Sequence, residues 1–303
     1  MNDDWPIRCP HCSETLALQR ETPDPQDGTA HGGMTDSGMT REAAPQPRRL
    51  RGLECPSGHH FTAARQGYVN MLVGRGSSST PDTSEMIMAR ERVQEAGLFD
   101  LLSLRLDGVL AEHAAEARTI LDAGTGTGHY LHSLLGPRPG VRGLALDLSP
   151  AGLKRAAKHE RVLALAWDLW RPLPLRSAGV DVVLDIFAPR NPEEYARVLA
   201  DGGSAVVVTP RPGHLAELAE AGLLSQQEDK QASLLGQMEP HFGAPAAQHA
   251  ITTTLPVEDE EAADLVLMGP AGHHRRRAEV LGAVAGQEIW SVTIDLDVTV
   301  WTL

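Results

Sequence analysis

The sequence predicts an α/β protein with a mostly parallel sheet, preceded by a small N-terminal module that binds a metal ion. Short apolar strands alternate with single helices from residue 119 onward, which is the pattern of βαβ units. A glycine-rich turn follows the first of these strands. The three cysteines are grouped near the N-terminus, and an odd, clustered set indicates a metal site rather than a disulfide framework.

Two domains are expected, divided after residue 76. Residues 1–76 form the zinc-binding module. Within it the stretch of about 20–50 is rich in Pro, Gly, Thr, Asp and Gln, lacks periodicity, and is expected to be a disordered insert. Residues 77–303 form the α/β domain. From Ser84 to about Ala114 this domain has helical apolar spacing behind a good N-cap.

Strands and helices then alternate along the chain. We expect strands at 119–123, 141–147, 161–166, 180–186 and 203–209, and helices near 128–135, 150–159, 192–200 and 213–224. Two longer strands, near 248–256 and 288–301, close the C-terminus. The last strand alternates apolar and polar residues, and this period of two predicts an antiparallel edge hairpin beside the parallel strands.

The charge of the chain limits its partners. A net charge of −13 argues against a general nucleic-acid binder, because phosphate contacts need Lys or Arg. The excess of acidic over basic residues is unevenly distributed: residues 1–76 hold nine acids and eight bases, whereas residues 77–303 hold 31 acids and 19 bases. Any RNA contact is therefore expected through local arginines and the N-terminal module.

The chain has no window of 18 uninterrupted apolar residues, so no membrane contact is expected. The acidic first five residues lack the apolar run of a secretory signal, and a cytoplasmic location follows as the default expectation. The sequence leaves open whether the protein forms a homodimer.

The glycine-rich turn has the form D-x-G-x-G-x-G, from Asp122 through Gly124 and Gly126 to Gly128. Glycines allow the backbone to turn sharply and approach a ligand, and the following helix N-terminus offers free N–H groups. The second strand ends in Asp147, 19 residues after Gly128, where an acid can accept ribose hydroxyls. The third strand ends at Asp168, whose carboxylate can accept a hydrogen bond from the adenine amino group. The alternative is that Asp168 caps the next helix or is a plain surface acid. This layout resembles class I S-adenosylmethionine methyltransferases, and a NAD-binding fold is the alternative.

A zinc site is predicted from a Cys-x2-Cys knuckle and a Cys-x3-His pair. Zinc takes four nitrogen or sulfur ligands in a tetrahedron, and one tight turn supplies two of them. His60 is the alternative to His59, and His11 is expected to point away. The 42 residues between the two pairs of ligands do not argue against one shared site, because the entropic cost of closing a loop rises only slowly with its length. The predicted ligands are Cys9, Cys12, Cys55 and His59.

Together these features resemble one family, the bacterial 23S rRNA guanine-N1 methyltransferases that act on hairpin 35 of domain II. Its members join an N-terminal zinc module to a class I methyltransferase domain. The resemblance covers about residues 5–225 apart from the insert. The matching stretches are Cys9-Pro-x-Cys12, Cys55-Pro-x-x-His59-x-Phe61, Gly67-Tyr-Val-Asn-x-Leu72, Ser84-Glu-Met86, Ala89-Arg90, Ala96-Gly97, the Asp122–Gly128 loop, Ala188-Pro189, Ala196-Arg-Val198, Gly202-Gly203, Thr209-Pro210 and His214-Leu-x-Glu-Leu218.

The resemblance implies S-adenosylmethionine and zinc as cofactors and 23S rRNA, or a ribosomal precursor, as partner. It implies methylation at position 748 or, less favoured, at position 745. The Arg-rich, Lys-poor composition favours the branch that modifies 748 and gives resistance to macrolides such as tylosin. The resemblance also places four residues around the cofactor: Phe99, Gly126, Thr127 and His214.

The target guanine is expected at the loop after the fourth strand. Phe187 could stack on the base, and Asp185 could accept the N1 proton, although the family does not hold an acid there. Phosphate contacts are expected from arginines, and the alternative for each is a solvated face. The candidates are Arg48, Arg49, Arg51, Arg65, Arg190, Arg211 and the run 273–277.

Two other functions fit parts of the sequence. One is a small-molecule methyltransferase of antibiotic biosynthesis, which has no use for a zinc knuckle. The other is a non-catalytic rRNA-binding assembly factor, against which the intact Asp122–Gly128 loop and Asp147 argue.

Overall fold

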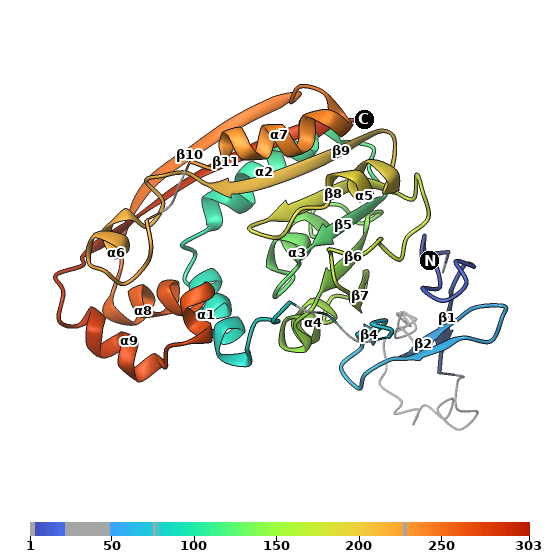
Figure 1. Ribbon diagram of the computed structural model, residues 1–303, viewed down its shortest axis with the longest axis horizontal. Helices are drawn as coiled ribbons and strands as arrows, with labels where there is room; N and C mark the ends of the chain where they lie inside the picture. The colour runs from blue at the N-terminus through green and yellow to red at the C-terminus, as the bar shows by residue number, and fades with distance from the viewer. Residues whose placement is uncertain (1–3, 22–48, 75–76, 78, 227–228) are drawn as a thin grey trace, which may run out of the picture.

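The computed structural model describes residues 4–21, 49–74, 77, 79–226 and 229–303. Most of the predicted insert at 20–50, including Arg48, lies outside the described residues. A large sheet crosses the molecule, and the N-terminal module lies at one end of it, at the lower right of Figure 1.

The sheet has eight strands in the order β10-β11-β9-β8-β5-β6-β7-β4. Strands β4 to β9 within it run parallel, whereas β11 is antiparallel to both of its neighbours, β9 and β10. This confirms the predicted class I methyltransferase fold, with a mostly parallel sheet and an antiparallel C-terminal strand. The bounds are β4 Val69–Asn70, β5 Thr119–Ala123, β6 Arg142–Asp147, β7 Val162–Ala166, β8 Val180–Ile186, β9 Leu199–Pro210, β10 Ala247–Pro256 and β11 Ser291–Thr302.

Up to residue 220 the helices lie in the predicted segments, whereas the helices between residues 231 and 284 were not predicted from the sequence. The segment predicted as one helix from Ser84 to Ala114 is two helices, because Gly97 adopts φ +77° between them. No described helix is both long and apolar enough to cross a membrane. The bounds are α1 Ser84–Glu95, α2 Asp100–His113, α3 His129–Leu135, α4 Pro150–Ala156, α5 Pro192–Val198, α6 Ala216–Glu220, α7 Gln231–Phe242, α8 Asp259–Leu267, the 3-10 helix η1 Pro270–His273 and α9 Arg277–Val284.

Two hydrophobic clusters lie on opposite faces of the sheet. Helices α2, α3, α4, α8 and α9 contribute to one of them, together with strand residues such as Leu184 and Val206. Helices α5 and α7 contribute to the other, together with Val183 and Val207. Neighbouring strand residues therefore enter different clusters, as expected for a sheet covered on both sides.

The N-terminal module packs on the same face as α5 and α7. Its own three-stranded antiparallel sheet consists of β1 Ala17–Arg20, β2 Leu50–Glu54 and β3 His60–Thr62. Residues 5–8 run along the irregular connection between β7 and β8: Arg8 N donates to Pro174 O at 2.8 Å, and Arg176 N donates to Pro6 O at 2.9 Å. The module thus takes the place that a crossover helix occupies elsewhere in the sheet. Since β4 also extends the main sheet, the two predicted domains share one core.

Candidate active site and metal cluster

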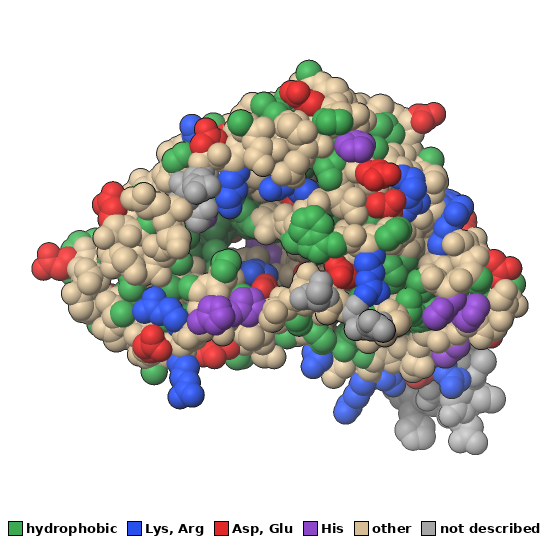
Figure 2. Space-filling model, in the orientation of Figure 1, with side chains coloured by type: hydrophobic (Ala, Val, Ile, Leu, Met, Phe, Trp, Pro, Cys, Tyr) green, Lys and Arg blue, Asp and Glu red, His purple; other side chains and the backbone are tan. Residues whose placement is uncertain are grey.

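A pocket of about 540 Å³ opens at the carboxyl ends of the central parallel strands. Ligands of open α/β sheets bind at this edge, and the volume is that of a small-molecule site. Figure 2 shows a hollow near the middle of the visible face, with hydrophobic, basic and histidine side chains around it. The glycine-rich loop, the ends of β6 to β9, and parts of α1 and η1 line the pocket.

The glycine-rich loop comes close to its neighbours on two sides. A Cβ atom at Gly124 would collide with the side chain of Ala188, and one at Gly126 would lie 2.9 Å from Nη1 of Arg90. Gly124, Gly126 and Gly128 all have positive φ, so side chains there would also strain the backbone. The loop is therefore a cradle that only glycine can form, next to an open volume.

Two carboxylates support this loop. Thr125 Oγ1 donates to Asp122 Oδ2 at 2.6 Å, and Gly126 N donates to Asp147 Oδ2 at 2.7 Å. Burial raises the pKa of Asp122 to about 7, although the Thr125 hydrogen bond opposes this. Burial also raises the pKa of Asp147, against the amides of Ser149 and Gly126. Each oxygen of Asp147 accepts one backbone bond and keeps a second lone pair for a ligand hydroxyl.

An aromatic corner made of Phe99, Phe187 and His214 forms another wall of the pocket. The rings of Phe187 and His214 are nearly parallel, at 15°, with centroids 6.1 Å apart. Phe187 is 43% exposed, and both Phe187 and Leu215 adopt positive φ. Non-glycine residues in this conformation are strained, and such strain concentrates at functional sites.

His214 presents a hydrogen-bond donor rather than a base. The backbone N–H of Asp295 donates to His214 Nδ1 at 3.3 Å, so the neutral ring carries its proton on Nε2. Burial lowers the pKa of His214 to about 4, although Asp295 and Glu217 oppose the shift. The ring is therefore neutral at pH 7.

Asp185 lies beneath the aromatic corner and does not line the pocket. It is fully buried, and Oδ2 accepts a hydrogen bond of 2.8 Å from the hydroxyl of Tyr195. Burial raises the pKa of Asp185 to about 7, while Tyr195, Arg190 and the Ala188 amide lower it. Its position fits a role in fixing the turn of Phe187 and Ala188, and it does not fit proton transfer with a ligand in the pocket.

A second group of reactive side chains lies in the N-terminal module. The ligand atoms of Cys9, Cys12, Cys55 and His59 all lie within 4.8 Å of one another. Cys12 Sγ is 3.6 Å from Cys55 Sγ, which is 3.3 Å from His59 Nδ1. Three sulfurs and one imidazole nitrogen are a donor set that suits tetrahedral zinc. The cluster does not include His60, and His11 stacks on His59 at 4.8 Å from outside.

Known proteins with similar sequences identify the family. A Streptomyces fradiae protein named 23S rRNA (guanine(748)-N(1))-methyltransferase is 39% identical over an alignment of 264 residues that covers 85% of this chain and 93% of that protein. The chain belongs to the 23S rRNA (guanine-N1)-methyltransferase family. A Micromonospora griseorubida protein, "Putative 23S rRNA (guanine-N(1)-)-methyltransferase", is 42% identical over 80% of this chain and 86% of that protein.

No model of a protein family matches the sequence of this chain. Among solved structures, the chain aligns with one described as "Complex between the Haloferax volcanii Trm112 methyltransferase activator and the putative methyltransferase". The TM-score is 0.45 at 21% identity, covering 74% of this chain and 99% of that one.

The structure brings most of the predicted cofactor residues of this methyltransferase to one pocket. Thr127 and Gly128 are exceptions: Thr127 Oγ1 donates to Gln94 at 2.7 Å, and Gly128 is the N-cap of α3. Asp168 lines the pocket and also accepts a hydrogen bond from Trp170 N at 3.1 Å, in a turn that no helix follows, so it is not a helix cap. The predicted residues that line the pocket are Phe99, Asp122, Gly124, Gly126, Asp147, Asp168, Phe187, Arg190 and His214.

The other predicted arginines do not gather at one place. Arg49, Arg51 and Arg65 are exposed on the module. Arg211 pairs with Asp295 at 2.8 Å and with Asp297 at 3.7 Å, so it is held by acids rather than free for a phosphate. In the run 273–277, Arg277 pairs with the buried Asp264 at 3.2 Å.

Several of the lining residues were not predicted at this site from the sequence. Arg90 pairs with Asp82 at 2.7 Å across the pocket wall, and Trp170 lies at its rim. Met268 and His273 come from the C-terminal helices. The sequence pointed to Arg90 only through the family match at Ala89-Arg90, and to His273 only as part of the run 273–277. Tertiary packing of α8 and η1 against α1 brings both to the site, together with Met268.

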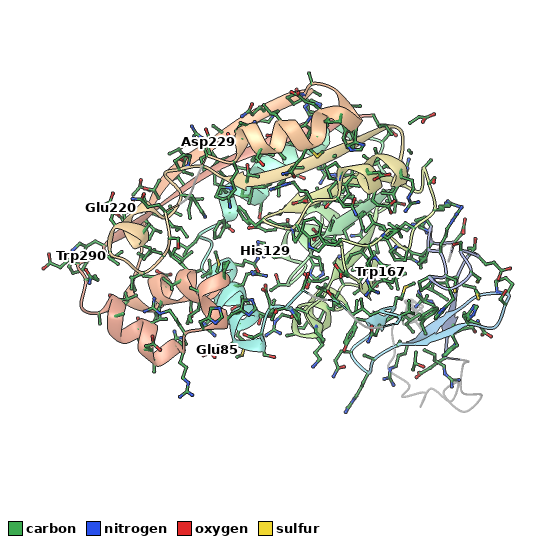
Figure 3. All side chains as sticks on the ribbon, viewed as in Figure 1. Glu85, His129, Trp167, Glu220, Asp229 and Trp290 are labelled. Carbon is green, nitrogen blue, oxygen red and sulfur yellow. The ribbon has the colours of Figure 1, made fainter. Side chains whose placement is uncertain are left out.

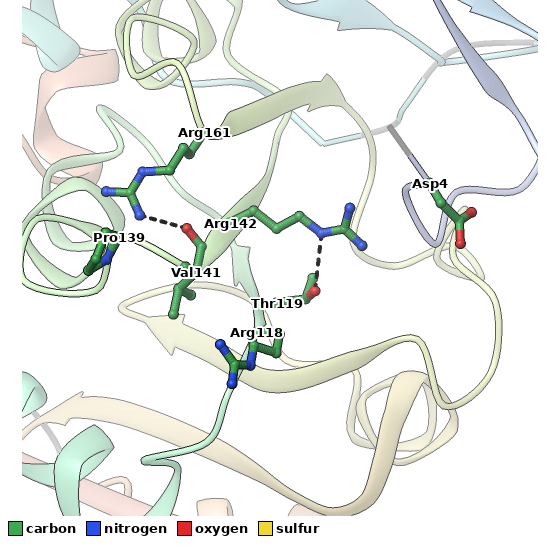
Figure 4. A pocket seen from close by; sticks show the side chains of 8 residues that line it. Asp4, Arg118, Thr119, Pro139, Val141, Arg142 and Arg161 are labelled. Carbon is green, nitrogen blue, oxygen red and sulfur yellow. Dashed lines mark hydrogen bonds between the residues drawn. The ribbon is translucent and has the colours of Figure 1, made fainter. Parts of the chain in front are cut away.

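A second hollow, of about 320 Å³, lies at the amino ends of β5 and β6. Figure 4 shows Arg161 turned to the carbonyl of Val141 and Arg142 turned to the hydroxyl of Thr119. Arg161 also donates to Leu135 O at 2.6 Å. The arginines there bind the ends of strands and helices together, so this hollow is structural.

The carboxylate of Asp147 gives the first testable prediction. Asp147→Ala removes the acceptor for the ligand hydroxyls and should weaken S-adenosylmethionine binding by roughly 1–3 kcal/mol. Isothermal calorimetry measures this loss. Glu220→Ala, an exposed acid at the end of α6, serves as control (Figure 3) and should bind as the wild type does. If Asp147→Ala binds S-adenosylmethionine with unchanged affinity, Asp147 only supports the glycine-rich loop and does not contact the ligand.

Proposed function

We propose that this protein transfers a methyl group from S-adenosylmethionine to N1 of a guanine in hairpin 35 of 23S rRNA, at position 748 rather than 745. The observation that supports this most is the match over 93% of a relative whose name specifies guanine 748. The proposed role is resistance to macrolides of the tylosin type, in the cytoplasm where ribosomal RNA is made.

S-adenosylmethionine fits the pocket through the loop of Gly124 and Gly126, where a Cβ would fill the cradle. Asp147 would hold its ribose, and Asp168 its adenine. The cofactor supplies a methyl group already activated by its sulfonium charge. The chain therefore has to contribute mainly in-line positioning of the acceptor and exclusion of water.

The target guanine would lie against the aromatic corner. A base inside a folded hairpin must leave its stack to reach such a pocket, and an exposed aromatic face stabilises the unstacked base. Phe187 offers that face, and His214 Nε2–H offers a donor to an acceptor such as the guanine carbonyl oxygen. Because Asp185 is buried beneath the turn and His214 is a donor, we propose that the N1 proton leaves to water at the pocket mouth.

The N-terminal module would dock the RNA. It is nearly neutral, and Arg49, Arg51 and Arg65 are exposed on it, whereas the remainder of the chain is strongly acidic. Arg190 at the pocket would add a contact near the target base. A zinc ion held by Cys9, Cys12, Cys55 and His59 would keep the module folded.

Mapping the methylated nucleotide tests the proposal. Methylation at N1 blocks base pairing, so reverse transcription of 23S rRNA should stop at position 748 in cells that express the gene and read through in cells that lack it. A stop at 745 would assign the other branch of the family. The absence of any new stop, together with methyl transfer to a small molecule, would replace the proposal by a biosynthetic role.

A further inference from the structure

Trp170 is an exposed tryptophan at the rim of the pocket. Its exposed fraction is 63%, and among the described residues only seven large hydrophobic side chains are exposed. Two of the seven, Trp170 and Phe187, line this one pocket. A tryptophan left in water next to a binding site is more informative than scattered surface leucines, since it offers a large flat face to a ligand.

The backbone around Trp170 is held firmly. Trp170 N donates to Asp168 Oδ1 at 3.1 Å, and Arg171 N donates to Asp168 O at 3.0 Å. Arg171 Nη1 also donates to Val73 O at 3.0 Å, which ties the turn to the end of the N-terminal module. The indole is therefore presented by a fixed turn, and its exposure does not result from a loose loop.

The same turn is connected to the loop that presents Phe187. Asn191 Nδ2 donates to Leu169 O at 2.9 Å, which joins the segment after β8 to the segment after β7. Ala188 and Leu169 also both lie against the space above Gly124. Two exposed aromatic rings, one on each loop, are thus held in a fixed relation at one opening.

Resting on the proposed function, we propose that Trp170 is a stacking platform for an unpaired nucleobase of the RNA next to the target guanine. Arg190 and Lys230 line the same opening and supply positive charge for the adjoining backbone. Stacking on an aromatic face requires an unpaired base but no particular base identity. The platform would therefore select a guanine whose neighbour is also unpaired.

Stacking has a different salt dependence from phosphate contacts. A base on Trp170 neutralises no phosphate, so loss of the indole should weaken RNA binding without changing the slope of log affinity against log salt. Loss of an arginine that contacts a phosphate should lower that slope by about one. This difference separates the platform from the arginines of the module.

The test uses the full chain and a fluorescently labelled RNA fragment of hairpin 35. Fluorescence anisotropy should show that Trp170→Ala binds this RNA about 10-fold more weakly at an unchanged salt slope, and that Trp170→Phe recovers most of the affinity. Trp290→Ala is the matched control: Trp290 is 76% exposed but lies at the far tip of the molecule from the pocket residue Trp167 (Figure 3). It should bind as the wild type does.

Calorimetry with S-adenosylmethionine distinguishes the competing role. If Trp170→Ala loses cofactor affinity and keeps RNA affinity, the indole covers the adenine and the platform is refuted. Unchanged RNA affinity in Trp170→Ala also refutes it, even where wild-type protein methylates rRNA as proposed. Conversely, Trp170-dependent RNA binding by a wild-type protein that methylates no guanine would keep the platform and overturn the proposed function.

Discussion

Cys12→Ser should lose about one equivalent of zinc per chain and with it the methylation of rRNA. Structural zinc contributes roughly 10–16 kcal/mol of apparent binding free energy in small zinc-finger peptides, and this is folding free energy. In this protein the cluster is continuous with the core: Cys9 and Cys55 are buried in the same hydrophobic cluster as Ile7 and Leu175. The damage should therefore reach the β7–β8 connection, which carries Asp168, and also weaken S-adenosylmethionine binding.

Metal analysis of the purified protein and a methylation assay measure the two effects. His60→Ala is the control, because His60 is exposed and outside the cluster. It should retain zinc and activity, whereas His59→Ala should lose both. A metal-free Cys12→Ser protein with wild-type methylation would show that the module folds without zinc. If His60→Ala lost zinc and His59→Ala kept it, His60 rather than His59 would be the fourth ligand.

The parallel strands and the glycine-rich loop were predictable because their signals are local. Each strand is a short apolar run between turns, and the acid before Gly124 distinguishes the loop from an ordinary dinucleotide site. The predicted helix at 213–224 shortens to α6, since Leu215 with φ +54° precedes it and Gly222 follows it. Local composition does not reveal that strain.

The position of Asp185 shows what its place in the sequence does not determine. The residue precedes the pocket loop in sequence, which suggested contact with the base. Along β8, however, Leu184 and Ile186 enter one cluster and Val183 the other, so Asp185 points away from the site toward Tyr195 on α5. The alternation of strand side chains was available from the sequence, but the partner of Asp185 was not.

The shared core of the module and the sheet could not be predicted either. The contacts of residues 5–8 with the β7–β8 connection join segments more than 160 residues apart. Such pairings depend on the whole fold, and they explain why no helix follows β7. They also mean that point substitutions, rather than deletion of residues 1–76, are the clean way to test the module.

Phe187→Ala should reduce kcat/KM for rRNA by roughly 10²-fold, mostly in kcat, because a base that is no longer stacked is poorly aligned for transfer. Phe187 has φ +56° and packs near Phe99 at 6.1 Å and near His214 at 6.1 Å. In Phe187→Ala the hydrogen bond between Tyr195 and Asp185 still holds the turn in place. The cofactor loop should therefore be unaffected, and S-adenosylmethionine affinity should stay within about twofold.

Steady-state methylation of a hairpin RNA and cofactor calorimetry separate these outcomes. Phe187→Tyr keeps an aromatic face and should retain most of the activity, while Leu104→Ala, which removes a side chain 68% exposed on α2, should leave both measurements unchanged. If Phe187→Ala instead loses cofactor affinity in proportion to kcat/KM, the ring packs on S-adenosylmethionine. His214 would then be the remaining residue of the aromatic corner that contacts the target guanine.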